Sequence, residues 1–335
     1  MSAGNDQLAD DTDEYIAPER GVSHFYESRP RVRARVEVAG RTHPGKVRPS
    51  NEDHYIAVRR YRGREVLATS LPVELLESVE DHAYTLAVAD GMGGRAFGEV
   101  ASLLALLTGW ELGGDEVKWT VRVNDREEEE FREKAQALYS LVNRTLHRQA
   151  QEHPRLAGMG TTLTVCYTTG DELFVLHAGD SRAYLYRDGA LTRLTRDHNL
   201  AQLLVDAGIA PPDSPETQKT RHVLTNVLGG PDTGVTVDVH RHQLQDGDTL
   251  LLCTDGLNDL IRDDEIAPFL DPSHTPDDAC RALIDLALER GGRDNVTVVV
   301  ARYQFNQPKA DGGLTTAEGR TGAVGGHSGG DVEGR

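Results

Sequence analysis

The chain has 335 residues, of which 38% are hydrophobic and 27% charged, a composition typical of a folded protein of one or two domains. Its 54 acidic residues outnumber the 36 basic ones, and the net charge of −18 disfavours binding to the phosphates of DNA or RNA. No apolar run approaches the ~18 residues of a membrane-spanning helix, and residues 1–30 lack the apolar core of a secretory signal.

The chain divides into an acidic leader, one patterned region and a glycine-rich tail. Residues 1–31 contain many acids and almost no apolar pattern, which predicts a disordered leader. Residues 304–335 carry nine glycines and are expected to form a flexible tail. Residues 32–303 show neither a linker-like break nor an internal repeat, so we expect a single domain there.

The patterned region begins with strands and two helices. Alternation at residues 31–38 and an apolar run at residues 84–89 predict strands. Residues 99–108 are expected to form a buried helix, and residues 126–153 a long amphipathic one. The apolar face of the long helix is predicted to contain Phe131, Ala135, Leu138, Val142 and Leu146.

Strands dominate the second half of the region. They are predicted at residues 161–167, 173–177, 183–187, 190–194, 249–253 and 295–301. Asp188-Gly189 is a strong hairpin signal between two of them. A helix at residues 199–207 is expected to end before the prolines Pro211, Pro212 and Pro215, and a second begins at Thr275-Pro276 and ends at Gly291-Gly292. Hairpins and separate helical blocks predict an α+β fold with antiparallel sheets.

Within residues 32–303 four aspartates precede a glycine, and their settings differ. Asp188 and Asp246 lie among polar residues, where a turn is the simpler interpretation. Asp90 and Asp255 instead end strongly apolar runs that no mirrored strand follows. A carboxylate at the end of a buried strand is partly desolvated and therefore needs a cation or a hydrogen-bond donor.

Two further aspartates occupy comparable positions. Asp294 precedes the last predicted strand, and Asp180 lies in a tight turn between two strands. Each of these aspartates, taken singly, is explained by a turn or a helix cap. As a set they offer only oxygen ligands, which suit hard cations such as Mg²⁺ or Mn²⁺.

Two other kinds of chemistry can be weighed against the metal hypothesis. Residues 91–96 match GxGxxA, but Asp90 would repel a pyrophosphate and the βαβ context of a dinucleotide site is missing. A cysteine-dependent phosphatase would need an arginine six residues after its cysteine, and none of the three cysteines has one. These cysteines are Cys166, Cys253 and Cys280. Their odd number and wide spacing predict a reduced, cytoplasmic protein without disulfides.

Seven sequence blocks occur in order between about residues 35 and 303. They are Gly45-x-x-Arg48-x-x-Asn51-Glu52-Asp53, VADGMGG at 88–94, GMGTTLTV at 158–165, HAGDSRAYLYRDG at 177–189, LTRDH at 194–198, LLLCTDGLND at 250–259 and GGRDN at 291–295. Each block is weak alone, but the ordered series resembles the metal-dependent protein phosphatase family, type 2C (PPM), in its bacterial form. The resemblance implies a four-layer α-β-β-α sandwich of two antiparallel sheets flanked by helices.

The resemblance also implies a two-metal centre for Mg²⁺ or Mn²⁺ at one edge of the sheets. Asp90 would bridge both ions, and Gly91 would offer its carbonyl to one of them. The second ion would be held by Asp255 and Asp294. A third, weaker metal position would be formed by Asp180, Asp255 and Asp259.

The same resemblance implies roles around the ions. Glu52 and Asp53 would act mainly through metal-bound waters, with Asp53 helping to orient the nucleophile, and Arg48 would grip the substrate phosphate. Residues 199–222 would form a variable flap beside the site. The implied activity is hydrolysis of phosphoserine and phosphothreonine by direct attack of a metal-activated water, in a monomer that opposes a serine/threonine protein kinase.

Some positions depart from the family pattern and leave alternatives open. His43, Met92 and Arg95 stand where many relatives have aspartate or histidine, so the general acid is not identified. Arg95 is expected either to attract substrate or to be a solvated loop residue. Residues 60–81 and 109–126 are long for the family core, and we interpret them as surface additions, with a partner site as the alternative. A pseudophosphatase on the same fold is the rival function, against which the retained ligand aspartates argue.

Overall fold

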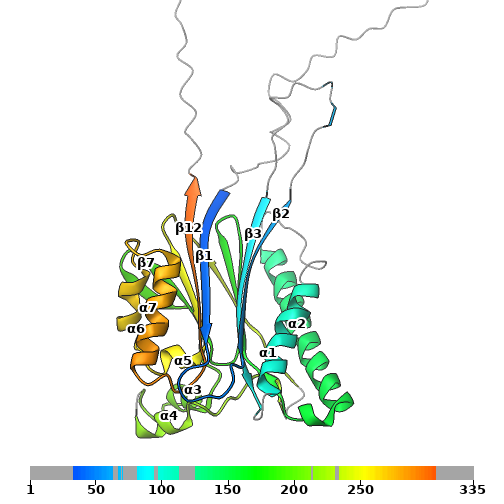
Figure 1. The fold of residues 1–335 in the computed structure, drawn as a ribbon. Coiled ribbons are helices and arrows are strands. Elements are labelled where there is room, and N and C mark those ends of the chain that lie inside the picture. Colours follow the sequence, from blue (N-terminus) through cyan, green and yellow to red (C-terminus); the bar gives the residue numbers. More distant parts are fainter. Residues whose placement is uncertain are drawn as a thin grey trace, which may run out of the picture.

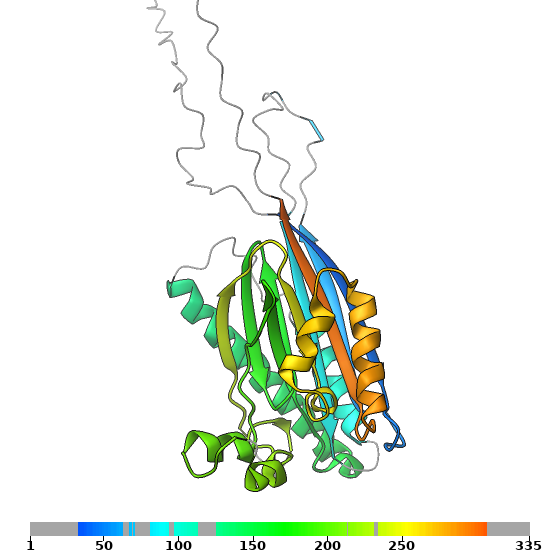
Figure 2. The same ribbon diagram turned by 90° about the vertical axis from the view of Figure 1, so that its left-hand side faces the viewer.

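The computed structural model describes residues 33–62, 67–68, 70, 81–93, 97–112, 125–212, 214–230 and 234–306. Within these ranges two antiparallel sheets pack face to face, and helices cover the outer surface of each sheet (Figures 1 and 2). The predicted α+β sandwich of four layers is therefore confirmed. The predicted leader, Arg95 and most of the two long stretches lie outside the described residues. No described helix is long and apolar enough to cross a membrane.

The first sheet has five strands in the order β1-β12-β11-β7-β8. These strands are β1 (Arg33–His43), β7 (Arg182–Arg187), β8 (Ala190–Arg193), β11 (Thr249–Cys253) and β12 (Val296–Asn306). Asp188 (φ 50°) and Gly189 (φ 83°) form the predicted turn between β7 and β8, with the two positive φ angles of a type I′ turn. Because β12 continues to Asn306, residues 304–306 belong to a strand rather than to the predicted tail.

The second sheet follows the order β10-β6-β5-β3-β4-β9, and β2 pairs with β3. Its strands are β2 (Asp53–Arg62), β3 (Asp81–Met92), β4 (Gly160–Thr161), β5 (Leu163–Thr169), β6 (Glu172–Ala178), β9 (Leu228–Gly229) and β10 (Asp238–Gln243). The sequence did not predict β2 or β10. In β10, an edge strand, only Val239 is buried, so the segment carries almost no apolar signal.

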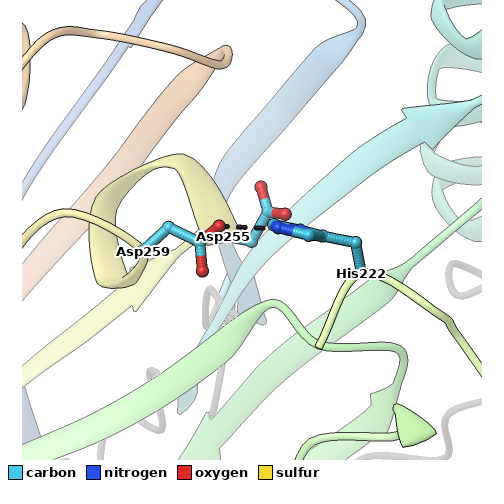
Figure 3. A group of neighbouring side chains, drawn as sticks. All are labelled: His222, Asp255 and Asp259. Carbon is cyan, nitrogen blue, oxygen red and sulfur yellow. Dashed lines mark ion pairs between the residues drawn. The ribbon is translucent and has the colours of Figure 1, made fainter. Parts of the chain in front are cut away.

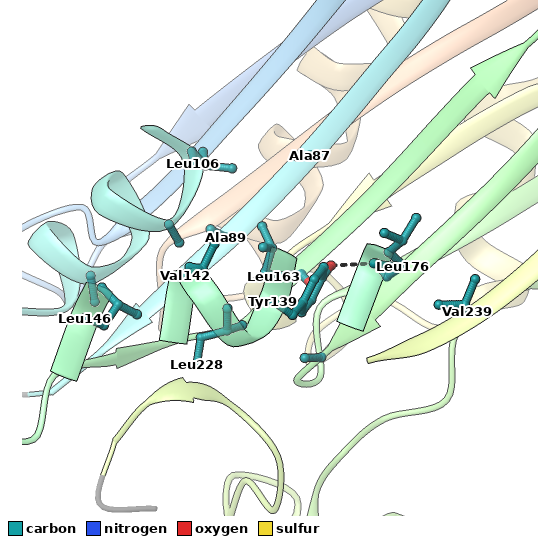
Figure 4. Close-up of a cluster of buried hydrophobic side chains, with 14 of the residues drawn as sticks. Ala87, Ala89, Leu106, Tyr139, Val142, Leu146, Leu163, Leu176, Leu228 and Val239 are labelled. Atoms are coloured by element: carbon teal, nitrogen blue, oxygen red, sulfur yellow. Dashed lines mark hydrogen bonds between the residues drawn. The ribbon is translucent and has the colours of Figure 1, made fainter. Parts of the chain in front are cut away.

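Two helices cover the outer face of the second sheet. They are α1 (Phe97–Leu112) and α2 (Asp125–Glu152). The predicted apolar face of α2 packs onto the sheet, with Val142 and Leu146 in the core next to Ala89 (Figure 4). Tyr139 was not predicted to belong to this face, yet it is fully buried. Its hydroxyl lies 3.1 Å from the carbonyl oxygens of both Leu163 and Leu176, so the polar end of the ring is satisfied.

A second set of helices covers the first sheet. The members are α5 (Asp255–Asn258), α6 (Asp263–Ile266), the 3₁₀ turn η4 (Ala267–Leu270) and α7 (Pro276–Glu289), whereas the other 3₁₀ turn, η3 (Pro154–Leu156), follows α2. As predicted, Thr275 caps α7, accepting a hydrogen bond from the backbone N–H of Asp278 at 3.1 Å, and Pro276 occupies the first turn.

The central strands are apolar on both faces because each face packs against a separate core. In β11, Leu250 and Leu252 point between the two sheets, whereas Leu251 and Cys253 pack under α7. This double burial explains the unbroken apolar run that the sequence shows at residues 249–253.

Two short helices form the flap, defined here as residues 199–222. They are α3 (Leu200–Asp206) and α4 (Pro215–Thr220). Asn199 caps α3, as the predicted helix start requires. Pro215 was expected to terminate a helix, but it begins α4 behind the cap Ser214, since proline suits the first helical turn.

Candidate metal centre

The aspartates at strand ends converge at one end of the sandwich. Asp53 begins β2 and lies opposite Asp90 of β3 in register. Asp255 follows β11, and Asp294 precedes β12, the antiparallel neighbour of β11. Asp180 lies in the turn between β6 and β7. Antiparallel pairing therefore brings together carboxylates that are far apart in the sequence.

A cavity of about 800 Å³ opens at this end of the sandwich. Its lining includes every residue that the sequence singled out for the site except Asp53, namely Arg48, Glu52, Asp90, Gly91, Asp180, Asp255, Asp259 and Asp294. The side chain of Asp53 is only 3% exposed. The candidate residues thus lie together in one site. The buried carboxylate of Asp53 lies beneath it, where β2 pairs with β3.

Asp53 has one carboxylate oxygen fully occupied and the other without an N–H or hydroxyl donor. Oδ2 accepts hydrogen bonds from the hydroxyls of Thr254 and Thr297, both at 2.7 Å. Oδ1 is buried and accepts no hydrogen bond from an N–H or hydroxyl group of the described residues, although a protonated Asp90 carboxyl hydrogen-bonds to the Asp53 side chain. Because an unsatisfied buried oxygen is costly, Oδ1 marks a place where the protein lacks a ligand.

A directed chain of hydrogen bonds holds Thr297 in place. Asn51 donates from its amide nitrogen to the hydroxyl of Thr42 at 2.8 Å, and Thr42 lies 2.7 Å from the hydroxyl of Thr297. Since Thr297 uses its only hydroxyl proton for Asp53, Thr42 must donate to Thr297. Neither Thr254 nor Thr297 was identified from the sequence, although one directly precedes Asp255 and the other is the second residue of β12.

Burial and mutual repulsion raise the pKa values of the clustered carboxyls. Burial raises the pKa of Asp53 to about 7, although its two threonine donors oppose the shift. Burial, reinforced by the charges of neighbouring aspartates, raises the pKa of Asp90 and of Asp255 well above the ordinary value. Burial also raises the pKa of Asp180 to about 7. Such a cluster cannot ionise fully without a compensating positive charge.

The backbone around Asp90 is rigidly held. Its N–H donates to the hydroxyl of Thr162 at 3.0 Å, and its carbonyl accepts from Thr162 N at 2.9 Å and Thr161 Oγ1 at 2.8 Å. A Cβ at Gly91 would lie 2.0 Å from the carbonyl oxygen of Gly98, so only glycine fits there. The residue after Asp90 therefore keeps α1 close to the site.

Arg48 and Asp294 form an ion pair at the rim of the cavity. Arg48 Nη2 lies 2.6 Å from Asp294 Oδ2, and the arginine side chain is 53% exposed. Asn295, which was not predicted to be a site residue, joins this rim to Glu52. Its Oδ1 accepts from the backbone N–H of Glu52 at 2.8 Å, and its amide nitrogen donates to the carbonyl of Ser50 at 2.8 Å.

The flap contributes an arginine and a histidine that the sequence did not predict at the site. Arg221 Nη2 lies 3.2 Å from Asp259 Oδ2, and His222 Nδ1 lies 3.7 Å from the same oxygen. Ligand atoms of His222, Asp255 and Asp259 all lie within 4.8 Å of one another (Figure 3). Burial raises the pKa of Asp259, and Arg221 and His222 counteract this shift.

The residues fit a site for hard divalent cations. The candidate ligands are carboxylate oxygens and one backbone carbonyl, the donors that Mg²⁺ and Mn²⁺ prefer. The unpartnered Oδ1 of Asp53 and the raised carboxyl pKa values are the features that a bound cation would relieve.

The competing kinds of chemistry do not fit. All three cysteines are buried free thiols, and burial raises the pKa of each to about 12, so none is a ready nucleophile. Gly91, the first glycine of the GxGxxA match, lies in a strand whose neighbours are all antiparallel. A dinucleotide site needs a parallel βαβ unit instead.

Sequence comparison relates the chain to known phosphatases. The family model described as Protein phosphatase 2C matches residues 74–288. The serine/threonine protein phosphatase PstP of Mycobacterium tuberculosis is 37% identical over 263 residues, 74% of this chain and 49% of PstP. The serine/threonine phosphatase stp of Listeria monocytogenes is 32% identical over 232 residues, 69% of this chain and 89% of stp. The chain thus spans about half the length of PstP.

Structural comparison gives a consistent result. The crystal structure of the catalytic domain of PstP, in complex with two manganese ions, matches with a TM-score of 0.63 at 34% identity. The match covers 81% of this chain and 100% of that one. The similarity therefore extends over the whole of that catalytic domain.

Proposed function

Because the chain belongs to the protein phosphatase 2C family, we propose that it is a metal-dependent serine/threonine protein phosphatase, a phosphoric monoester hydrolase. The observation that carries this proposal is the buried Asp53 Oδ1, which accepts no hydrogen bond from an N–H or hydroxyl group in the described part of the chain and lies in a cluster of carboxylates with raised pKa values. Buried carboxylates that repel one another destabilise the metal-free fold, and bound cations would remove this repulsion. Such clusters are therefore typical of functional sites.

We assign the metal ligands as the family resemblance implies. Two Mg²⁺ or Mn²⁺ ions would be held by Asp53, Asp90, Gly91, Asp255 and Asp294, and a third, weaker ion by Asp180, Asp255 and Asp259. Cations held there would lower the pKa of a bound water and neutralise charge on the phosphoryl oxygens. The two manganese ions in the catalytic domain of PstP support the assignment.

The protein's own side chains would orient the reactants. Arg48, exposed at the rim, offers a guanidinium fork that matches two phosphate oxygens. Because Thr254 and Thr297 fix Oδ2 of Asp53, its Oδ1 cannot rotate away and stays available to orient an attacking water. Glu52, whose backbone N–H donates to Asn295, would act through metal-bound waters, as the family resemblance implies.

The substrates we propose are proteins phosphorylated on serine or threonine by a protein kinase. The cavity is open enough for a phosphorylated side chain, and the flap borders it through Arg221 and His222. Nucleic acids are disfavoured as partners by the net charge of −18. We further propose that the protein acts as a monomer in the cytoplasm, where three buried free thiols stay reduced.

Hydrolysis of a phosphothreonine peptide tests the proposal. Phosphate release should require Mn²⁺ or Mg²⁺, stop on chelation and resume when metal is restored. Asp90→Asn should abolish it, because a buried carboxylate that would hold the ions loses its charge. Asp188→Asn is the matched control: this aspartate also precedes a glycine but lies in the β7–β8 turn, where asparagine tolerates positive φ.

Two outcomes would contradict the proposal. Binding of Mn²⁺ without hydrolysis by the wild type would indicate a pseudophosphatase. Turnover by Asp90→Asn at the wild-type rate would show that the reaction does not depend on the assigned metal centre.

A further inference from the structure

His198 connects three segments at the base of the flap. Its Nδ1 lies 3.2 Å from the backbone nitrogen of Gly179 and 3.0 Å from the amide nitrogen of Asn226. Its Nε2 lies 3.0 Å from a carboxylate oxygen of Asp238, and the side chain is only 11% exposed. The imidazole therefore uses both ring nitrogens for hydrogen bonds inside the protein.

The partners of His198 determine which ring nitrogen carries the proton. The backbone N–H of Gly179 can only donate, so Nδ1 must accept. The orientation of the Asn226 amide is set independently, because its Oδ1 accepts from Thr236 N at 3.1 Å and its nitrogen donates to Thr236 O at 2.7 Å. The amide nitrogen of Asn226 thus also donates toward Nδ1. The neutral ring carries its proton on Nε2 and donates it to Asp238.

The main chain of His198 joins the two ends of the flap to the same turn. Its N–H donates to the carbonyl of Gly179 at 2.7 Å, and its carbonyl accepts from Thr225 N at 2.9 Å. One step into the flap, Leu200 N donates to the carbonyl of Val223 at 2.8 Å. The chain therefore enters and leaves the flap next to the turn that contains Gly179.

That turn is linked to the candidate metal ligands through close packing and hydrogen bonds of Thr162. Gly179 precedes Asp180 and has a φ of +118°, and a Cβ there would lie 2.5 Å from the side chain of Thr162. Thr162 Oγ1 in turn lies 2.8 Å from the hydroxyl of Ser181 and accepts from Asp90 N at 3.0 Å. A shift of the turn would therefore move Asp180 relative to Asp90.

We propose that His198 is a positioning residue that couples the flap to Asp180 by presenting an unprotonated Nδ1 to the Gly179 N–H. The proposal rests on the proposed function only in assigning a metal-binding role to Asp180. In structural terms, the turn that contains Gly179 is held by the hydrogen bond that Nδ1 accepts. The size of the ring and the hydrogen bond to Asp238 do not hold it.

Two substitutions separate these contributions. His198→Asn keeps an acceptor oxygen at the δ position and loses the group that reaches Asp238. His198→Gln moves its polar group to the ε position and leaves the Gly179 N–H without an acceptor. Asp238→Asn is the control, because its amide oxygen can still accept the Nε2 proton.

Calorimetric titration of the full chain with Mn²⁺ measures how each substitution changes the affinity of the weak site assigned to Asp180. We expect His198→Gln to weaken the weak site by about tenfold, the loss of roughly one hydrogen bond, and to leave the two tight sites unchanged. His198→Asn and Asp238→Asn should stay within about threefold of wild type. Equal weakening by the Asn and Gln variants, or no change in either, would overturn the proposal.

Nuclear magnetic resonance supplies readouts that need neither activity nor metal. In the metal-free wild type, the ¹⁵N shifts of His198 should show a protonated Nε2 and a bare Nδ1. The Gly179 amide should exchange with solvent about tenfold faster in His198→Gln than in His198→Asn. A protonated Nδ1 in the wild type would refute the inference even if both variants failed to fold. Inactivity of a wild type with the expected tautomer and exchange would instead count against the proposed function alone.

Discussion

Replacing Asp53 by asparagine should stabilise the metal-free protein at alkaline pH while removing its activity. Burial raises the pKa of this carboxyl from 3.8 to about 7 in the folded protein. The fold therefore favours the protonated form, and asparagine imitates that form without a titratable proton. Its amide oxygen can keep the bonds from Thr254 and Thr297, while its NH₂ group takes the place of the unpartnered Oδ1.

The sign and size of the change in the free energy of unfolding follow from the linkage between protonation and folding. A folded pKa above the unfolded one means that stability is fully present below about pH 4 and is lost as the pH rises through about 7. A shift of about three units at about 1.36 kcal/mol per unit gives a loss of about 4 kcal/mol at about pH 8. At about pH 5 the folded carboxyl is still protonated, and the loss is only about 1 to 2 kcal/mol.

Urea unfolding in the presence of a chelator measures this difference. The free energy of unfolding of Asp53→Asn minus that of wild type should increase by about 2 to 3 kcal/mol between about pH 5 and about pH 8. Added Mn²⁺ should stabilise the wild type more than the variant, because cations bind the folded carboxylate. Asp188→Asn, in an exposed turn, should show no such change with pH. A difference that stays constant with pH would refute the reasoning.

Three further predictions concern neighbouring groups. Thr297→Val removes a donor to Asp53, so the pH at which Mn²⁺ half-saturates the protein should rise by about one unit in a pH-dependent titration. Asp180→Ala should lower phosphopeptide turnover while calorimetry still detects two tightly bound Mn²⁺ ions; loss of all binding would contradict its placement at the weak position. Arg48→Ala should raise the KM for a phosphopeptide by about tenfold or more in steady-state kinetics, since a charge-assisted fork to phosphate is lost, and an unchanged KM would exclude that contact.

The sequence by itself predicted the central strands, the long helices and the aspartates that line the cavity. Runs such as residues 249–253 are apolar throughout because both faces of β11 are buried, and this signal is local. The α7 cap at Thr275 and the β7–β8 turn are also local, since each depends on a few consecutive residues. The aspartates could be identified because a carboxylate that ends an apolar run needs compensation wherever its neighbours lie.

Only the tertiary structure decided how these residues are held. Thr297 and Thr254 reach Asp53 across strands from distant parts of the chain, and a threonine in a strand has no local feature that distinguishes such a donor. The ion pair of Arg221 with Asp259 likewise depends on where the flap folds back. β10 forms because β6 supplies a hydrogen-bonding edge, since its own sequence is almost entirely polar. Hydrophobic periodicity is a property of consecutive residues and can be read from the sequence. Hydrogen-bond partners and strand register depend instead on which distant segments pair in the fold.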